Sequence, residues 1–410
     1  MEKTDKGLTL RFVTLAIGMF AIGTDSFVVA GILPSVAEDL DVDVPTSAEL
    51  ITAYALSYAV LSPVVAAVAA RVPRRVLLIG GLLVFIAGNL GTGLAPSFEV
   101  AMGFRVMAAL GGAMFTPTAA GVVVSLAGPE RRGTALSILF GGLSAATALG
   151  SPLGTAISGF TDWRGTMVFV AAVGLVALIA VSLALPSVPS PPAVSLRERL
   201  SPLTDARIAL TLLLVLVGYS GLFVLYTYVS QVFDPATDGS GRRLAWLLFA
   251  WGIAAVVGNM TSGRLTDKLG SRVVINTAGV IAVAVFVTTP WTSRHLATAF
   301  VAVVLWGACG WAMLVPIQHR LAGVNPAVAQ MSISLSSSAN YAGVSLAPVI
   351  GHFFLDQGVD MRYLGVPSAA IVVAGLLIGE AGHLLIRRAQ RQAEADSGGA
   401  PAEDRAVPAR

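Results

Sequence analysis

Two ionisable residues lie inside long apolar stretches of the sequence, where a charge is costly. Asp25 falls in the apolar window 9–33 and Arg105 in the window 98–125. A charged side chain within a membrane span costs about 2.5–3.5 kcal/mol on insertion scales, so such residues usually face a cavity and have a partner. Each lies about eight or nine residues from the same end of its window, which at about 1.5 Å per residue gives the two similar depths. We therefore predict that Asp25 and Arg105 lie at one level of the membrane and form a proton-coupling site, in which Asp25 takes up and releases a proton.

Two interpretations of Asp25 that involve no proton transfer stay open. The carboxylate is then either half of a static buried ion pair or a polar group near the outer rim of the membrane. A further acid and base, Glu380 and His383, are three residues apart and share a helix face. A proton relay is one interpretation of that spacing, but local pairing with the nearby Arg387 and Arg388 at the membrane interface is favoured.

Two groups of aromatic residues recur at helical spacing. Tyr54 and Tyr58 share one face of a window, and Tyr219, Phe223 and Tyr226 share a face of another. Stripes of this kind are most often packing or lipid-facing features. The alternative is the wall of an apolar cavity with hydroxyl groups, which suits amphipathic aromatic compounds.

The sequence lacks the patterns that hold common cofactors. Its His, Cys and Asp residues do not show metal-ligand spacing, and it has no glycine-rich loop that ends in Lys-Ser or Lys-Thr for nucleotide phosphates. Basic residues are scattered rather than clustered, so no nucleic-acid partner is expected. We expect no cofactor, and a proton gradient as the source of energy.

The composition predicts how these residues are held in place. Of 410 residues, 55% are hydrophobic and 12% are charged, and the mean hydropathy is +0.80. At about 20 residues per span, the chain has room for twelve helices with short loops and none for a large soluble catalytic domain. An all-α membrane protein is predicted, with spans near residues 9–33, 48–70, 76–95, 98–125, 133–157, 166–185, 208–232, 244–262, 273–290, 296–318, 327–352 and 366–386.

The windows divide into two halves. Residues 1–185 are predicted to form one six-helix bundle and 207–388 a second, joined by a proline-rich cytoplasmic linker at 186–206 and followed by a disordered tail at 389–410. Sliding the halves past each other by about 197 positions matches Arg75 with Arg272, as expected of a parallel internal repeat in a carrier. With both termini in the cytoplasm, five basic residues fall in outer loops, a distribution that the positive-inside rule favours: Arg164, Arg242, Arg243, Arg294 and Arg362.

Several motifs resemble those of the major facilitator superfamily. The segment GRLTDKLGSR, which contains Gly263, Asp267, Gly270 and Arg272, is similar to its cytoplasmic loop signature. The run RVMAALGGA begins at Arg105 and resembles the span-4 pattern of the same family. The run ALGSPLGT holds three residues that resemble the Gly-Pro pattern of the proton-linked drug antiporters: Gly150, Pro152 and Gly154.

The opening GTDSFVVAGILP looks like the subgroup that exports chloramphenicol and sugars. There the acidic residue usually stands directly before the phenylalanine, whereas here Ser26 does and Asp25 is one position earlier. In the first half, the loop corresponding to GRLTDKLGSR has Ala70 and Pro73 where the signature has its aspartate and glycine.

The resemblance implies two pseudo-symmetric six-helix bundles around a central cavity, lined in part by the spans of Asp25 and Arg105. It implies that the motif loop residues and the Gly-Pro stretch act in conformational gating. The predicted protein is not an enzyme but a monomeric exporter of small amphipathic drugs or antibiotics in a bacterial inner membrane. A sugar or polar metabolite exporter and a non-transporting membrane sensor remain as alternatives.

Overall fold

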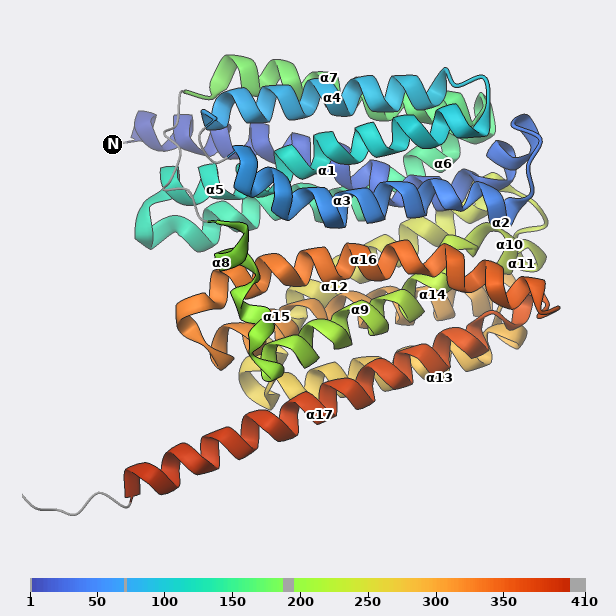
Figure 1. Cartoon of the computed structure of the whole chain (residues 1–410). Coiled ribbons are helices and arrows are strands. Elements are labelled where there is room, and N and C mark those ends of the chain that lie inside the picture. The colour runs from blue at the N-terminus through green and yellow to red at the C-terminus, as the bar shows by residue number, and fades with distance from the viewer. Residues whose placement is uncertain (1, 70–71, 187–194, 399–410) are drawn as a thin grey trace, which may run out of the picture.

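The structure is a computed structural model that describes residues 2–69, 72–186 and 195–398. Within these ranges, the side chains of residues 2–7, 128–134 and 393–398 are not described. Within these ranges every regular element is a helix, as predicted for an all-α membrane protein. Figure 1 shows long helices running side by side, with those of residues 2–186 in one layer and those of residues 206–398 in the other.

The first layer contains the six spans predicted before residue 186. They are α1 (Glu2–Asp39), α3 (Glu49–Val68), α4 (Arg74–Gly93), α5 (Phe98–Ala145), η2 (Ala146–Gly150) with α6 (Ser151–Phe160), and α7 (Trp163–Ala184). The helix α5 includes the fourth span and the start of the fifth, which η2 and α6 complete.

The second layer begins after a short connection formed by α8 (Leu196–Leu200) and η3 (Ser201–Thr204). Its long helices are α9 (Ala206–Thr227), α12 (Gly241–Leu269), α13 (Ser271–Thr292), α14 (Leu296–Ala312) with α15 (Leu314–Val324), α16 (Ala329–Asp356) and α17 (Gly365–Gly398). Short helical turns complete it: α10 (Val229–Val232), α11 (Asp234–Thr237), η4 (Pro326–Val328) and η5 (Met361–Tyr363).

Eleven of the described segments are long and apolar enough to cross a membrane. The helix α16 makes the twelfth predicted span but falls outside that group because it is less apolar, with five serines and one asparagine in residues 332–340. It packs against α3 of the first layer and α9 of the second. A polar helix in this position supplies polar groups to the contact between the two layers, where the Tyr341 hydroxyl lies 3.4 Å from that of Ser26 and the Ser345 carbonyl accepts from Thr52.

The tail differs from expectation. A disordered segment was predicted from residue 389, but α17 continues to Gly398. Residues 389–397 contain Ala, Gln, Arg and Glu without Gly or Pro, and these are good helix formers. The helix therefore extends about three turns beyond the apolar window, and the rest of the predicted tail lies outside the described residues.

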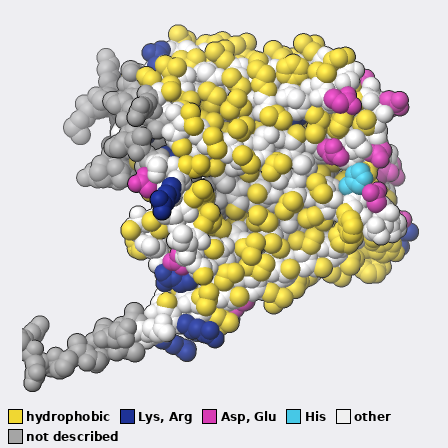
Figure 2. All heavy atoms as spheres, viewed as in Figure 1, with side chains coloured by type: hydrophobic (Ala, Val, Ile, Leu, Met, Phe, Trp, Pro, Cys, Tyr) yellow, Lys and Arg dark blue, Asp and Glu magenta, His cyan; other side chains and the backbone are white. Residues whose placement is uncertain are grey.

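We call the end of the molecule where α1 begins and α17 finishes the near end, and the opposite end, which holds α2 (Val44–Ser47), α10 and α11, the far end (Figure 1). Figure 2 shows a broad apolar belt between them, with acidic side chains gathered at the far end and Lys and Arg side chains at the near end. Asp43 caps α2 by accepting a hydrogen bond from the Thr46 amide, 2.7 Å long, and hydrogen bonding to Thr46 holds the pKa of its carboxyl below the usual range.

Candidate functional site

The structure brings Asp25 of α1 and Arg105 of α5 together in the first layer. The Arg105 Nη1 donates to Asp25 Oδ1 over 2.5 Å, and the two side chains are 1% and 0% exposed. The guanidinium also lies 4.5 Å from the centre of the Tyr54 ring. A charged pair so fully removed from water is tolerated only because the charges neutralise each other and share further contacts.

Small residues allow the helices around this pair to approach closely. A Cβ added at Gly88 of α4 would lie 2.4 Å from the Ala108 nitrogen, and one at Gly111 of α5 would lie 2.4 Å from the Phe85 nitrogen. These contacts explain the Ala-Leu-Gly-Gly-Ala run that follows Arg105. They also bring the residue after Gly88, Asn89, close to the ion pair.

Three polar atoms around the ion pair lack a hydrogen-bond partner although they are buried. They are Asp25 Oδ2, Tyr54 Oη and Asn89 Oδ1. Asn89 lies near Asp25, and its Nδ2 donates to the Phe85 carbonyl over 3.1 Å. Sequence reasoning missed Asn89, and the available signal was an amide side chain inside the apolar window 76–95. The free Oδ2 is an atom on which the carboxyl can hold a proton while Oδ1 stays near Arg105.

Ser26, next to Asp25, faces the other layer. Its hydroxyl lies 3.4 Å from the Tyr341 hydroxyl of α16, and the Tyr341 ring centre is 4.0 Å from that of Tyr58. One residue turns a helix by about 100°. The offset between Ser26 and Asp25 therefore puts the acid inside the first layer and the serine at the contact between layers. Tyr341 was not singled out from the sequence because its window has no strong aromatic pattern.

The two predicted aromatic stripes lie in different places. Tyr54 and Tyr58 are beside the ion pair and Tyr341, whereas Tyr219, Phe223 and Tyr226 belong to a larger group around Phe27 of α1. We call this group the aromatic cluster. It includes three tryptophans that sequence reasoning missed, and its members are Phe27, Tyr219, Phe223, Tyr226, Trp251, Trp306 and Trp311.

The aromatic cluster has polar atoms as well as apolar faces. The Trp251 Nε1 is buried and has no hydrogen-bond partner, while Tyr219 Oη donates to the Gly310 carbonyl over 3.4 Å. Phe223 and Trp311 are only partly buried although they lie in the middle of the molecule. An apolar surface with an unused N–H donor is suited to a flat molecule that carries a hydrogen-bond acceptor.

The Gly-Pro stretch lies where α6 meets α1 and the second layer. Its first residue, Gly150, is the last residue of the π-helical turn η2, and such turns are frequently found at functional sites. A Cβ at Gly150 would lie 2.0 Å from Thr24 Oγ1, and one at Gly154 would lie 2.3 Å from Val28 Cγ2. Pro152 is buried between them. Close packing against α1 therefore explains why small residues stand at these positions. That the stretch bends during transport stays a prediction.

The residues of the second-half motif loop, GRLTDKLGSR, make different contacts from one another. Gly270 ends α12 with a φ of +80°, a conformation that favours glycine. Arg272 of α13 pairs with Glu380 of α17, with N–O distances of 2.6 to 3.0 Å. The favoured local pairing of Glu380 with Arg387 and Arg388 is therefore wrong, because α13 offers both Arg272 and Asn276 across the helix contact.

The other two loop residues have no such contact with α17. A Cβ at Gly263 would meet only Val315 Cγ1, at 4.0 Å, and Asp267 lies on the exposed side of α12. The described contacts of this loop thus fasten α13 to α17 within the second layer. Its role in gating stays a prediction.

Hydrogen bonds between the two layers lie toward the far end. Tyr226 Oη donates to the Phe27 carbonyl over 3.0 Å, and Ser151 Oγ lies 3.2 Å from the same hydroxyl. Thr52 Oγ1 donates to the Ser345 carbonyl over 3.0 Å. These bonds hold the far ends of the layers together in this conformation.

Replacing Tyr226 with phenylalanine should loosen the far end. The loss of one hydrogen bond costs about 0.5–1.5 kcal/mol, which lowers the share of the closed conformation about twofold to tenfold relative to open forms. The labelling rate of a cysteine placed at Ala30, with Cys309 replaced by serine, should rise in Tyr226→Phe. The control Tyr363→Phe removes an exposed hydroxyl at the same end, and equal labelling in all three proteins would contradict the prediction.

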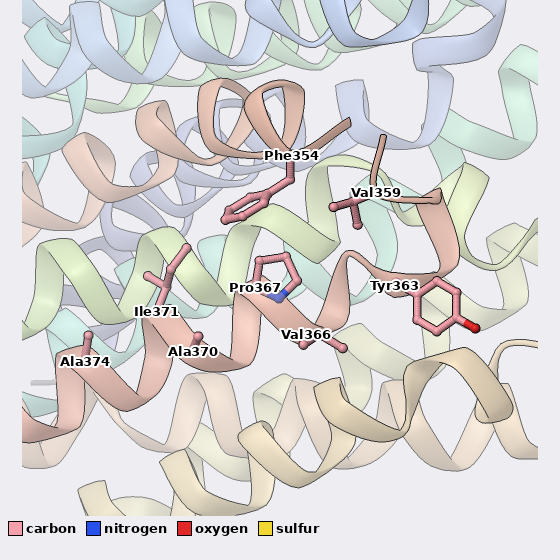
Figure 3. A pocket seen from close by; sticks show the side chains of 8 residues that line it. All are labelled: Phe354, Val359, Tyr363, Val366, Pro367, Ala370, Ile371 and Ala374. Atoms are coloured by element: carbon pink, nitrogen blue, oxygen red, sulfur yellow. The ribbon is translucent and has the colours of Figure 1, made fainter. Parts of the chain in front are cut away.

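A separate apolar pocket of about 590 Å³ lies between α16 and α17. Figure 3 shows its lining residues, which include Phe354, Pro367 and Ile371 but none of the predicted site residues. It contains no part of the ion pair or of the aromatic cluster. We therefore do not assign the pocket to the candidate functional site.

The family model and the relatives found for this chain agree on one family. The model for the Major Facilitator Superfamily matches residues 15–348. The uncharacterized MFS-type transporter YtbD of Bacillus subtilis is 26% identical over 96% of this chain and 100% of its own length. The inner membrane transport protein YdhP of Escherichia coli K12 is 27% identical over 89% and 93%. A chloramphenicol resistance protein of Streptomyces lividans is 33% identical over 65% of this chain and 69% of its own length.

Proposed function

Since this chain belongs to the Major Facilitator Superfamily of multi-pass membrane transporters, we propose that it is a proton-coupled antiporter that exports small amphipathic compounds. One observation carries the proposal. The fully buried Asp25–Arg105 pair leaves Asp25 Oδ2 without a partner in the membrane-spanning part of the first layer. Charged residues in such positions mark ion pathways and proton relays.

In the proposed cycle, a proton binds Asp25 Oδ2 and removes the negative charge that Arg105 neutralises. The guanidinium then keeps its contacts with Tyr54 and the Leu50 carbonyl but loses its counter-ion. An uncompensated buried charge is costly, so protonation favours a conformation in which Arg105 finds water or another partner. Loss of the proton restores the pair and resets the transporter.

The aromatic cluster is the proposed binding surface for the exported compound. Its partly exposed members, Phe223 and Trp311, offer flat apolar faces, and Trp251 Nε1 offers a donor. The relative from Streptomyces lividans is a chloramphenicol resistance protein, and an uncharged aromatic antibiotic fits these surfaces. The described members of the aromatic cluster are uncharged, and the charges of Asp25 and Arg105 cancel. The exported compound therefore needs no charge of its own.

We further propose that the protein works as a monomer in a bacterial inner membrane, with both termini in the cytoplasm. The near end then faces the cytoplasm, and the gathering of Lys and Arg side chains at that end supports this orientation. Transport against a gradient is driven by protons that enter as the compound leaves.

The substrate class is tested by competition. In vesicles that hold the purified protein and an imposed pH gradient, uncharged aromatic antibiotics such as chloramphenicol should be transported and should compete with one another, whereas sugars should not compete. Trp311→Ala should raise the half-saturating concentration several-fold, because it removes an aromatic contact worth about 0.5–1.5 kcal/mol beyond its buried area. The control Trp246→Ala changes a tryptophan that is 58% exposed on α12 and should have no effect. Competition by sugars alone would favour the polar metabolite exporter instead.

A further inference from the structure

A group of basic side chains converges at the near end of the second layer, outside the proposed transport site. We call it the near-end basic cluster, and it lies around Glu380 and His383 of α17: Arg272 of α13, Arg320 of α15, His383 itself and Arg387 of α17. Glu380 receives three hydrogen bonds from Arg272 and one from Asn276. Arg272 and Arg320 thus share this single carboxylate, and with Arg387 beside His383 the cluster carries an excess of positive charge.

Two nitrogen atoms of this cluster are buried and unused. Arg320 is 6% exposed and donates through Nη1 to the Gly379 carbonyl over 3.2 Å, yet its Nε has no hydrogen-bond partner. His383 Nε2, which lies one turn after Glu380 on α17, has no hydrogen-bond partner either. A buried charged donor without a partner is costly. An anion that accepts from these nitrogens would remove that cost.

The surroundings favour an anion that is attached to apolar chains. Leu377, Glu380 and Leu384 are spaced so that they share one face of α17, and the two leucines are 66% and 54% exposed. Val273, next to Arg272 on α13, is 47% exposed. Apolar side chains therefore flank the cluster on the surface that faces lipid, as the acyl chains of a phospholipid require.

We propose that the near-end basic cluster binds the phosphate of an anionic phospholipid, whose acyl chains lie along Leu377 and Leu384. Basic pockets between helices at one membrane face are suited to anionic headgroups. The phosphate accepts hydrogen bonds from Arg320 and His383, and Arg387 adds charge at the rim. The bound lipid fastens α15 to α17 at the near end.

Lipid-dependent thermal unfolding of the full-length protein tests the proposal. In uncharged detergent, added phosphatidylglycerol should raise the melting temperature, whereas phosphatidylcholine and inorganic phosphate at equal concentration should not. His383→Leu and Arg387→Gln should each raise the half-saturating phosphatidylglycerol concentration, by about tenfold for His383→Leu, since a lost contact of about 1.4 kcal/mol is a factor of ten. The control Arg362→Gln removes an exposed arginine at the far end and should respond as the wild type does.

Three results would overturn the proposal. Equal stabilisation by phosphatidylcholine would mean that charge is not recognised, and equal stabilisation by inorganic phosphate would mean that the site takes free phosphate rather than lipid. An unchanged response in both His383→Leu and Arg387→Gln would place the lipid elsewhere. Since the measurement reports lipid binding and not transport, failure of the proposed transport function leaves it intact.

Discussion

Replacing Asp25 with asparagine is expected to reduce pH-gradient-driven transport to background. The amide has nearly the same shape as the carboxyl but neither binds nor releases a proton in the working pH range. It also leaves Arg105 without its counter-ion in both halves of the cycle. Vesicles with an imposed pH gradient measure the effect directly, with the amount of inserted protein determined in parallel.

A matched control makes this result specific to the buried acid. Glu38→Gln removes a carboxylate from the same helix, α1, at an exposed position near the far end. It should transport as the wild type does. If Asp25→Asn also keeps wild-type rates under a pH gradient, Asp25 is half of a static pair and the coupling role is wrong.

Removing the other half of the pair should cause the largest loss of stability. Arg105→Leu leaves the Asp25 carboxylate buried without its counter-ion, and breaking a buried pair in this way costs about 3–5 kcal/mol. The double variant Asp25→Asn with Arg105→Gln buries two neutral amides instead. It should recover most of the lost stability while remaining inactive in gradient-driven transport.

Thermal unfolding in detergent, together with the fraction of protein that inserts into the membrane, measures both variants. Recovery of stability without recovery of transport separates the structural role of the pair from its role in coupling. A double variant as unstable as Arg105→Leu would show that Arg105 acts through its packing on Tyr54 rather than through charge balance.

The depth of the two charged residues was predictable from the sequence, whereas their neighbours were not. Counting residues along the apolar windows was sufficient to expect Asp25 and Arg105 at one level, because helix rise is constant. The rotation of each helix about its axis is set by packing, here by Gly88 and Gly111. For that reason Asn89 could not be assigned to the site from its window alone.

The same reasoning explains the other differences. Apolar windows identify spans but not which helices touch, so the sequence favours a partner for Glu380 on its own helix, whereas the structure pairs it with Arg272 of α13. The three tryptophans of the aromatic cluster come from α12 and α14, which meet only in the folded chain. The motif loop of the second half was recognisable, yet its sequence did not reveal that Arg272 binds α17 while Asp267 does not.

The most direct test of the central claim is proton movement driven by the compound itself. Vesicles with purified protein and equal pH on both sides are given a transmembrane gradient of an uncharged aromatic antibiotic, and the internal pH is followed. The account predicts that the compound moving down its gradient drives protons in the opposite direction, and that Asp25→Asn abolishes the pH change. Movement of the compound through the wild-type protein with no pH change would contradict proton-coupled antiport.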